Sequence, residues 1–397
     1  MVPTYVPAWR HGGPVRAVHG LCKALAARGH QVTVFTTDVD AGSPPLDRAA
    51  AIDGVAVRYF AVRRPRRLYL APAMAAALAL ELPACDVVHL HSVFLWPTAA
   101  AARAAAWAGV PYLVAPRGML VPDLVHRRGR LRKLLWLGLV ERRTLGEAAA
   151  LHATSALEAH DAEELGAWLG LSLPPAVVVA NGFEDEPPAR EADLSPAVRG
   201  ALARRPLLLF LGRVSWKKGI DRLIRALPRI PGACLAIAGN DEEGLRPGLE
   251  RLAAELGAGD RVVFLGEIHG AGKAALLHGA DILVLPSHSE NFGNAVLEAM
   301  AAGCAVAVTP EVGLAEVVRA TGAGIVAEGD PTALGDALAA LLSAASARRA
   351  MGERGAAVAR ERFGWGAIAR EMEAVYRGLV PLRRTSTGAL PAERRPR

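Results

Sequence analysis

The feature that most constrains the fold of this chain is a repeated alternation of two kinds of segment. Short runs rich in valine, leucine and other apolar residues are followed by a glycine-rich or polar turn, and then by an alanine-rich stretch of helical composition. Strands that alternate with helices form parallel sheets covered on both faces, so we predict an α/β protein. The predicted strands span residues 31–36, 55–60, 87–91, 112–115, 150–153 and 177–180, and then 207–211, 234–238, 262–265, 282–285 and 305–308.

The length of the chain and one break in this pattern predict two domains. With 397 residues the chain can form two cores. The stretch NGFEDEPPAREADLSPAVRG, which begins at residue 181, is rich in proline and acid and is typical of a linker. We predict two doubly wound, Rossmann-like domains that face each other across a cleft. The predicted divisions are an N-terminal domain at 1–185, a linker at 186–205, a C-terminal domain at 206–362, a helix at 363–380 that crosses back to the N-terminal domain, and a basic, disordered tail at 381–397.

Composition indicates a globular protein of a reducing compartment. Hydrophobic residues make up 52% of the chain and charged residues 21%, and the four cysteines are scattered without a Cys-x-x-Cys pair. No segment has the pattern of a signal peptide, and the most apolar window, residues 68–82, is too short to cross a membrane. We therefore expect a cytoplasmic protein. Its first residues, VPTYVPAW, have the composition of a loop that follows a strand, so either the fold begins with a truncated strand or the true start lies upstream.

The stretch LLLFLGRVSWKKG places two cations next to a predicted strand. Arg213 follows the strand that ends at Leu211, and Lys218 opens the next helix. Ligands of doubly wound sheets bind beyond the carboxyl ends of the strands, where these side chains can hold a diphosphate. Lysine is scarce in this chain, which favours a role in ligand binding for the adjacent lysines at 217 and 218. The alternative is a charged helix start, which the helix dipole would mildly disfavour.

The stretch PSHSENFGNAVLEAM sets two glutamates around a predicted loop and helix start. Glu290 lies in the loop after the strand at 282–285, and Glu298 lies more than one turn into the helix that begins at Asn294. Gly293 lets the backbone approach a ligand, and the first N–H groups of the helix face the cleft. The Glu298 carboxylate suits the two hydroxyls of a ribose, and the Glu290 carboxylate suits sugar hydroxyls or a developing positive charge. The alternative is that both are solvated surface acids.

These motifs resemble those of the retaining family-4 glycosyltransferases of the GT-B fold. The Glu-x7-Glu pattern from Glu290 to Glu298 and the Arg-x4-Lys pattern from Arg213 to Lys218 are the specific part of the likeness. The glycine-rich loop Gly12-Gly13-Pro14 and the Asn181-Gly182 element are also similar, and the likeness extends to about residue 376. The segments PRGML and HLHSVFLWP resemble a narrower group that acts in polysaccharide and lipopolysaccharide biosynthesis.

The resemblance implies a role for each matching residue. Arg213 and Lys218 would bind the donor's diphosphate and stabilise the leaving group, with Gly13 offering its backbone from the opposite domain. Glu298 would bind the ribose, and Glu290 would hold the transferred sugar together with the backbone at Phe292, Gly293, Asn294 and Ala295. Such enzymes use neither a metal nor another cofactor and retain the anomeric configuration. The implied catalytic residues are Glu290, Arg213 and Lys218.

This chain departs from the family pattern at one place that bears on contacts to the sugar or acceptor. Many relatives have a histidine after the strand at 112–115, where this chain has Arg117 and Gly118. Arg117 could bind a phosphate or sugar hydroxyls, or it could be a structural arginine that bridges loops. His91, near the end of its strand, is a cleft candidate or a buried structural histidine. We take Gly12, His91, Arg117 and Gly118 as the candidates for contacts to the acceptor or sugar.

Two basic clusters bear on the partners of the chain. HRRGRLRK at 126–133 runs into the apolar LLWLGLVERR, and RRPRR lies at 63–67. Such a surface could contact the anionic inner face of the cell membrane, which would suit a lipid-linked acceptor; the alternative is a packed helix with a solvated basic edge. Nucleic acid is excluded as a partner because aromatics are only 5% and no recognised module is present.

The predicted function is the transfer of a sugar from a UDP- or GDP-sugar to a glycan or lipid-linked oligosaccharide in cell-surface polysaccharide biosynthesis. A sugar-nucleotide 2-epimerase of similar fold and a non-catalytic sugar-nucleotide-binding protein are the alternatives. A nicotinamide dehydrogenase is disfavoured because no Gly-x-Gly-x-x-Gly follows a strand.

Overall fold

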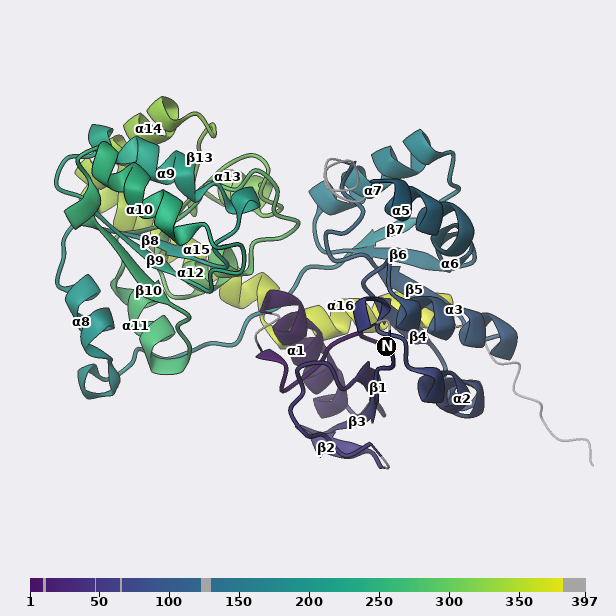
Figure 1. Cartoon of the computed structure of the whole chain (residues 1–397). Helices are drawn as coiled ribbons and strands as arrows, with labels where there is room; N and C mark the ends of the chain where they lie inside the picture. The colour runs from purple at the N-terminus through teal and green to yellow at the C-terminus, as the bar shows by residue number, and fades with distance from the viewer. Residues whose placement is uncertain (10–11, 47, 65, 123–129, 381–397) are drawn as a thin grey trace, which may run out of the picture.

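Two α/β lobes lie side by side and are joined by the chain at two places (Figure 1). The structure is a computed structural model, and it describes residues 1–9, 12–46, 48–64, 66–122 and 130–380. The predicted tail at 381–397 and residues 126–129 of the basic segment at 126–133 lie outside the described residues. Apolar strands form the centre of each lobe, as in β8, where the side chains from Leu207 to Phe210 are fully buried.

The N-terminal lobe contains two sheets that the first residues of the chain connect. The first sheet has the order β1-β3-β2, with β1 and β3 parallel and β2 antiparallel, and the second is the parallel sheet β4-β5-β6-β7. Between them, Val2 N donates a hydrogen bond to Phe35 O at 3.1 Å, and His91 N donates one to Met1 O at 3.0 Å. The strands are β1 (Thr33–Thr37), β2 (Ala50–Ile52), β3 (Val55–Phe60), β4 (Val88–His91), β5 (Tyr112–Ala115), β6 (Ala150–Ala153) and β7 (Ala176–Val178).

The C-terminal lobe has one parallel sheet of six strands in the order β10-β9-β8-β11-β12-β13. This is the strand order of the Rossmann fold, in which the chain direction across the sheet reverses between the first strand, here β8, and the fourth, here β11. The crevice between the carboxyl ends of those two strands is the place where such sheets bind ligands. The strands are β8 (Leu207–Leu211), β9 (Cys234–Ala238), β10 (Val262–Gly266), β11 (Ile282–Leu285), β12 (Ala305–Val308) and β13 (Gly324–Val326).

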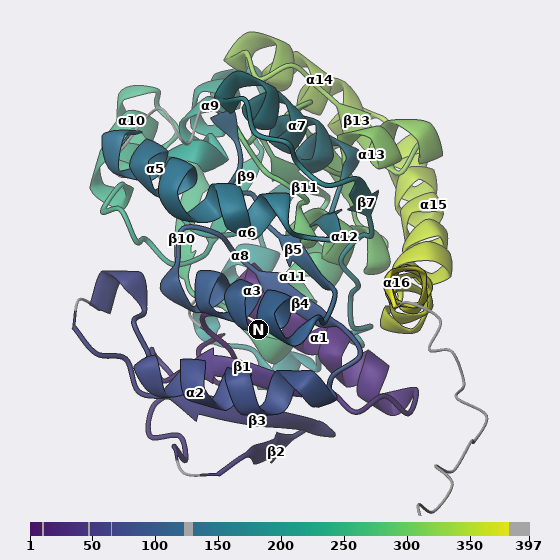
Figure 2. The same cartoon turned by 90° about the vertical axis from the view of Figure 1, so that its right-hand side faces the viewer.

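Helices cover both faces of the C-terminal sheet and pack around the N-terminal sheets (Figures 1 and 2). In the described part of the chain, no helix is both long enough and apolar enough to cross a membrane. The α-helices are α1 (Gly13–Ala27), α2 (Pro72–Glu81), α3 (Trp96–Ala108), α5 (Arg130–Trp136), α6 (Arg142–Gly146), α7 (Ala156–Leu169), α8 (Pro196–Leu202), α9 (Ile220–Ala226), α10 (Arg246–Glu255), α11 (Gly270–Gly279), α12 (Asn294–Ala301), α13 (Ala315–Thr321), α14 (Pro331–Ser343), α15 (Ala345–Phe363) and α16 (Trp365–Leu379).

The last helix, α16, returns to the N-terminal lobe and packs beside α1 (Figure 2). Glu373 of α16 is buried and accepts hydrogen bonds from Arg28 and His30 at the end of α1, at 2.8 and 2.9 Å. Where the chain crosses between the lobes, Phe183 N donates a hydrogen bond of 3.1 Å to Phe363 O. The two crossings are therefore adjacent.

The α/β fold with two Rossmann-like lobes was predicted correctly, and every strand predicted from the sequence is present within three residues of its expected bounds. Two strands were missed, β2 and β13. Each has only three residues, and each lies at the edge of its sheet. The sequence AAI of β2 and the sequence GIV of β13 are too short to show an apolar period.

Candidate active site

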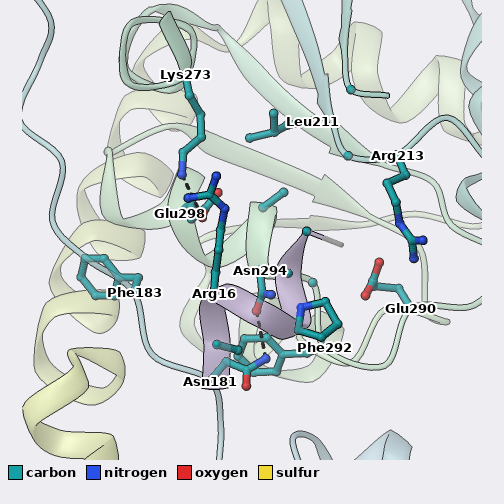
Figure 3. A pocket seen from close by; sticks show the side chains of 18 of the residues that line it. Arg16, Asn181, Phe183, Leu211, Arg213, Lys273, Glu290, Phe292, Asn294 and Glu298 are labelled. Atoms are coloured by element: carbon teal, nitrogen blue, oxygen red, sulfur yellow. Dashed lines mark hydrogen bonds and ion pairs between the residues drawn. The ribbon is translucent and has the colours of Figure 1, made fainter. Parts of the chain in front are cut away.

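A cavity of about 350 Å³ lies between the two lobes, and residues from both lobes line it (Figure 3). On its C-terminal side it borders the ends of β8 and β11, which is the crevice that the strand order predicts. Eleven of the thirteen predicted site residues line it: Gly12, Gly13, Arg117, Arg213, Lys218, Glu290, Phe292, Gly293, Asn294, Ala295 and Glu298. His91 and Gly118 lie outside the lining of this cavity.

The two predicted cations each meet a carboxylate. Lys218 and Glu290 form an ion pair in which the two side chains are only 13% and 14% exposed. Arg213 lies closer to solvent, with 42% of its side chain exposed, and its Nη1 donates to Glu242 Oε2 at 2.9 Å. The predicted Arg-x4-Lys and Glu-x7-Glu motifs are thus in direct contact through Lys218 and Glu290.

The loop after β11 fixes Glu290 through its backbone. Glu290 N donates to Glu311 O at 3.0 Å, and Gly313 N donates to Glu290 O at 2.8 Å. Burial raises the pKa of the Glu290 carboxyl. Lys218, Lys217 and the Phe292 backbone N–H together lower it by more, so the net pKa is below its ordinary value. Glu290 is therefore a carboxylate at neutral pH. Burial also lowers the pKa of Lys217.

Two helices begin opposite each other in the cavity. The helix α1 starts at Gly13 in the N-terminal lobe, and α12 starts at Asn294 after Gly293, whose φ is 102°. A Cβ atom added to Gly13 would lie 2.7 Å from Asn294 Nδ2, so a larger residue at this position would displace the Asn294 side chain. Asn181 Nδ2 donates to Asn294 Oδ1 at 2.9 Å (Figure 3). Helix N-termini attract anions, and here two of them converge on one cavity.

The second glutamate, Glu298, lies at another part of the cavity wall beside Lys273 (Figure 3). Lys273 Nζ donates to Glu298 Oε1 at 3.0 Å and lies 3.2 Å from Glu186 Oε1. The Glu298 side chain is 25% exposed and the Lys273 side chain 11%. Glu298 is therefore a paired carboxylate at the cavity wall and differs from the solvated acid that the sequence left open.

Arg117 bridges loops of the N-terminal lobe, which is one of the two alternatives that the sequence left open. Its φ is 56°, its Nη1 donates to Asn181 Oδ1 at 2.7 Å, and its Nε donates to His91 Nδ1 at 3.3 Å. Arg117 still borders the cavity, while His91 is 4% exposed behind it. Burial lowers the pKa of His91 well below its ordinary value, so the imidazole is neutral.

Behind His91, three more side chains connect the N-terminal lobe to α16. His152 Nε2 donates to Val179 O at 2.9 Å, so its Nδ1 accepts a hydrogen bond from His89 Nε2 at 3.1 Å. His89 Nδ1 is then left to accept from the Tyr376 hydroxyl at 2.8 Å. Burial lowers the pKa of both histidines, in His152 to about 3. These neutral histidines have a structural role.

Gly118 contacts the loop that carries Glu290. Its N–H donates to the buried Glu158 Oε1 at 2.6 Å, and a Cβ atom added to it would lie 3.0 Å from the side chain of Asn291. In the same region Ser155 Oγ donates to Asn291 O at 2.6 Å. The N-terminal lobe therefore supports the glutamate loop directly.

Lys273 and Arg16 are among the polar residues of the cavity wall that the sequence did not single out. Lys273 could have been noticed because lysine is scarce in this chain. Arg16, one turn into α1, approaches His269 of the opposite lobe, with Arg16 Nη2 at 3.1 Å from His269 Nδ1. No pattern in the sequence indicates that these two meet, because they are 253 positions apart.

Apolar and basic side chains are exposed on the N-terminal lobe. Leu135 and Leu139 are 63% and 74% exposed, and the arginines at 142 and 143 that follow are exposed as well. The described arginines of the cluster at 63–67 are also exposed.

Comparison with known proteins identifies the family of this chain. The family model described as "Glycosyl transferase 4-like domain" matches residues 12–182, and "Glycosyl transferases group 1" matches residues 194–358. A D-inositol 3-phosphate glycosyltransferase from Xylanimonas cellulosilytica is 31% identical over 398 residues, which cover 92% of this chain and 91% of the relative.

Two solved structures have the same fold. Sucrose-phosphate synthase from Thermosynechococcus elongatus has a TM-score of 0.74 at 24% identity, covering 95% of this chain and 98% of that chain. HepE from Anabaena, in complex with UDP and glucose, has a TM-score of 0.71 at 18% identity, covering 95% and 99%. The two-lobed fold with its intervening cavity is thus the GT-B fold, as predicted. This chain belongs to the glycosyltransferases that combine a 4-like N-terminal half with a group 1 C-terminal half.

Proposed function

We propose that this glycosyltransferase transfers a sugar, with retention of anomeric configuration, from a nucleoside diphosphate sugar to a glycan or lipid-linked oligosaccharide acceptor. The observation that carries the proposal is the convergence on one cavity of two helix starts, at Gly13 and Asn294, with the cations Arg213 and Lys218. A diphosphate has the charge that such a site attracts.

Arg213 and Lys218 act on the diphosphate in this proposal. In the structure each is paired with a carboxylate, Glu242 and Glu290. The oxygens of a diphosphate compete for the same N–H groups and carry more negative charge. As the bond to the sugar breaks, charge accumulates on the leaving phosphate, and a preorganised cation stabilises that charge more than the charge of the ground state.

Glu290 acts on the sugar. It is ionised and held by its backbone, and it lies beside the start of α12. A carboxylate in this position accepts hydrogen bonds from sugar hydroxyls and stabilises positive charge that develops on the ring. Glu298 binds the ribose hydroxyls of the nucleotide. A protein of the same fold was solved with UDP and glucose, so a uridine donor is the first to be tested.

The N-terminal lobe provides the acceptor side, with Gly12 and Arg117 at the cavity wall. The exposed Leu135 and Leu139 near exposed arginines support a lipid-linked acceptor and peripheral contact with the inner face of an anionic membrane. We infer a role in cell-surface polysaccharide biosynthesis from this combination. Vesicles of anionic lipid should bind the wild type, and Leu135→Ser/Leu139→Ser should bind less. The matched control is Leu80→Ser, since Leu80 is 82% exposed on α2, outside this segment.

A second acceptor class has its own support. The curated relative that matches 92% of this chain is a D-inositol 3-phosphate glycosyltransferase, which favours a phosphorylated polyol. Both acceptor classes require the same donor site, so one assay with the two acceptors separates them.

The experiment that tests the proposal measures donor binding first and turnover second. Thermal unfolding is followed with UDP, GDP, ADP and dTDP, for the wild type, Glu298→Ala and the exposed control Glu316→Ala. A nucleotide at a hundred times its Kd adds about 2.7 kcal/mol of stability. We expect one nucleotide to stabilise the wild type and the control by this amount, and to stabilise Glu298→Ala clearly less.

Turnover is then measured with the matching sugar donor and both acceptors, and the anomeric configuration of the product is read by NMR. Transfer with retention is the expected result. Formation of an epimerised sugar nucleotide without acceptor would instead identify an epimerase, and binding without turnover with any acceptor would identify a sugar-nucleotide-binding protein. An inverted product would overturn the retaining mechanism.

A further inference from the structure

Lys273 is a buried cation held between two carboxylates at the cavity wall. Its Nζ lies 3.0 Å from Glu298 Oε1 and 3.2 Å from Glu186 Oε1, and its side chain is 11% exposed. Figure 3 shows the pair of Lys273 and Glu298. The three residues come from different parts of the chain: Lys273 from α11, Glu298 from α12 and Glu186 from the segment that follows the first crossing between the lobes.

The position of Lys273 in its helix is unfavourable unless a carboxylate compensates it. It lies in the first turn of α11, which begins at Gly270, and a cation near a helix N-terminus opposes the helix dipole. Burying the ammonium adds a desolvation cost. The two carboxylates offset both costs, so Lys273 stays in one place and its N–H groups have fixed directions.

The contact with Glu298 is made through one carboxylate oxygen. The hydrogen bond is to Oε1, and a carboxylate has a second oxygen with its own acceptor sites. A carboxylate held at one oxygen has lost most of its rotational freedom, so its other oxygen keeps a defined direction at the cavity wall. Preorganisation of this kind increases the discrimination between ligands that can and cannot donate to that oxygen.

We propose that Lys273 is a positioning residue that holds Glu298 so that its free oxygen accepts a hydrogen bond from a ribose hydroxyl of the donor. Lys273 thereby sets the preference of this enzyme for ribonucleotides over deoxyribonucleotides. Glu186 also pairs with Lys273. The inference rests on the proposed function, because it takes the ligand beside Glu298 to be the nucleoside of the donor.

The test compares the Kd of a nucleoside diphosphate with that of its 2′-deoxy form by calorimetry. The probe is whichever of UDP, GDP and ADP stabilises the wild type most, paired with dUDP, dGDP or dADP. We expect the wild type to bind the ribonucleotide about tenfold more tightly, since loss of the hydroxyl leaves the second Glu298 oxygen without its hydrogen bond. Lys273→Met should bring this ratio below about threefold, with the Kd of the deoxy form unchanged within about twofold.

Three further variants make the result specific. Lys273→Arg, which can donate to the same oxygen, should recover most of the ratio. Glu186→Gln should keep the wild-type ratio, since the bond between Lys273 and Glu298 remains. In Glu298→Ala, adding Lys273→Met should change the ratio no further. If Lys273→Met does not fold, as judged by circular dichroism, Lys273→Gln takes its place.

The outcomes separate this inference from the proposed function. A wild-type ratio in Lys273→Met overturns the inference and leaves the nucleotide site intact. Equal weakening of both nucleotides also overturns it, because Lys273 would then contact the base or the phosphates directly. If the wild type binds none of the nucleotides, the proposed function fails and the inference with it.

Discussion

The side-chain amide of Asn181 donates a hydrogen bond of 2.9 Å to Asn294 Oδ1 and so joins the two lobes across the cavity. The same side chain accepts a hydrogen bond of 2.7 Å from Arg117 Nη1. Asn181 is 7% exposed, and Asn294 is the first residue of α12. This amide therefore helps to fix the position of the helix start relative to the N-terminal lobe.

The two bonds of Asn181 can be separated by substitution. Asn181→Asp keeps an acceptor for Arg117 but loses the donor to Asn294, whereas Asn181→Ala loses both. We expect kcat/KM to fall about tenfold in both variants, and stability to fall by about 1–3 kcal/mol only in Asn181→Ala, where a buried donor is left unpaired. Urea unfolding and steady-state kinetics measure the two effects. Wild-type kinetics in Asn181→Asp would show that the bond to Asn294 has no role in transfer.

Removal of Lys218 should affect both turnover and stability. Lys218→Met removes a cation from the diphosphate site, and we expect kcat to fall by at least about a hundredfold. It also leaves the Glu290 carboxylate buried without its partner, which should cost about 3 kcal/mol of stability.

The double variant Lys218→Met/Glu290→Gln tells these two effects of Lys218 apart. Stability should return, because no unpaired charge remains, while activity should stay low, because both Lys218 and Glu290 act in transfer. Arg225→Met on the exposed face of α9 is the control for loss of one cation. Recovery of activity in the double variant would contradict the assignment of Lys218 to the diphosphate.

The packing of α16 against α1 predicts that the cost of a substitution at Gly20 depends on the side chain at position 365. The Trp365 ring lies against Gly20 of α1 so closely that a methyl group at position 20 would overlap it. Gly20→Ala should therefore cost about 1–3 kcal/mol by overpacking. In a Trp365→Ala background the same change should cost much less, because the ring is gone. Equal costs in the two backgrounds, measured by urea unfolding, would mean that the effect of Gly20→Ala is not steric.

The ion pairs of Glu373 predict how stability depends on pH. Hydrogen bonds from Arg28 and then His30 lower the pKa of Glu373 to about 2. An unfolded glutamate has a pKa of about 4.3, so the pairing stabilises the protein above that pH and is lost as the pH falls toward 2. In Glu373→Gln the wild-type advantage should be present at pH 6 and should shrink from pH 4.5 to pH 3. A difference in free energy of unfolding that stays constant over this range would argue against the pairing.

The parts of the site that follow a strand directly could be predicted from the sequence. Arg213, Lys218 and the loop with Glu290 are each within a few residues of a long apolar strand, and parallel strands bring their carboxyl ends to one edge of a sheet. Glu298 follows on the helix after that loop. Local sequence and sheet topology are enough to bring these residues to one cavity.

Contacts between residues that lie far apart in the sequence could not be predicted in this way. Whether Arg117 points to a ligand or to a neighbouring loop depends on where Asn181 lies, and Asn181 is 64 residues away in the sequence. Lys273 and Glu298 are on separate helices, and their pairing depends on how α11 and α12 pack in the folded lobe. The chosen divisions of the chain at 185, 205 and 362 stay predictions.

The two crossings between the lobes lie side by side, hydrogen-bonded through Phe183 N and Phe363 O. Two connections at one spot behave as a single pivot: the lobes can swing about it, but neither can slide along or away from the other. A small rotation there displaces the far rim of the cavity most and the side chains near the pivot least. Asn181, two residues from Phe183, should therefore keep its geometry through such a swing.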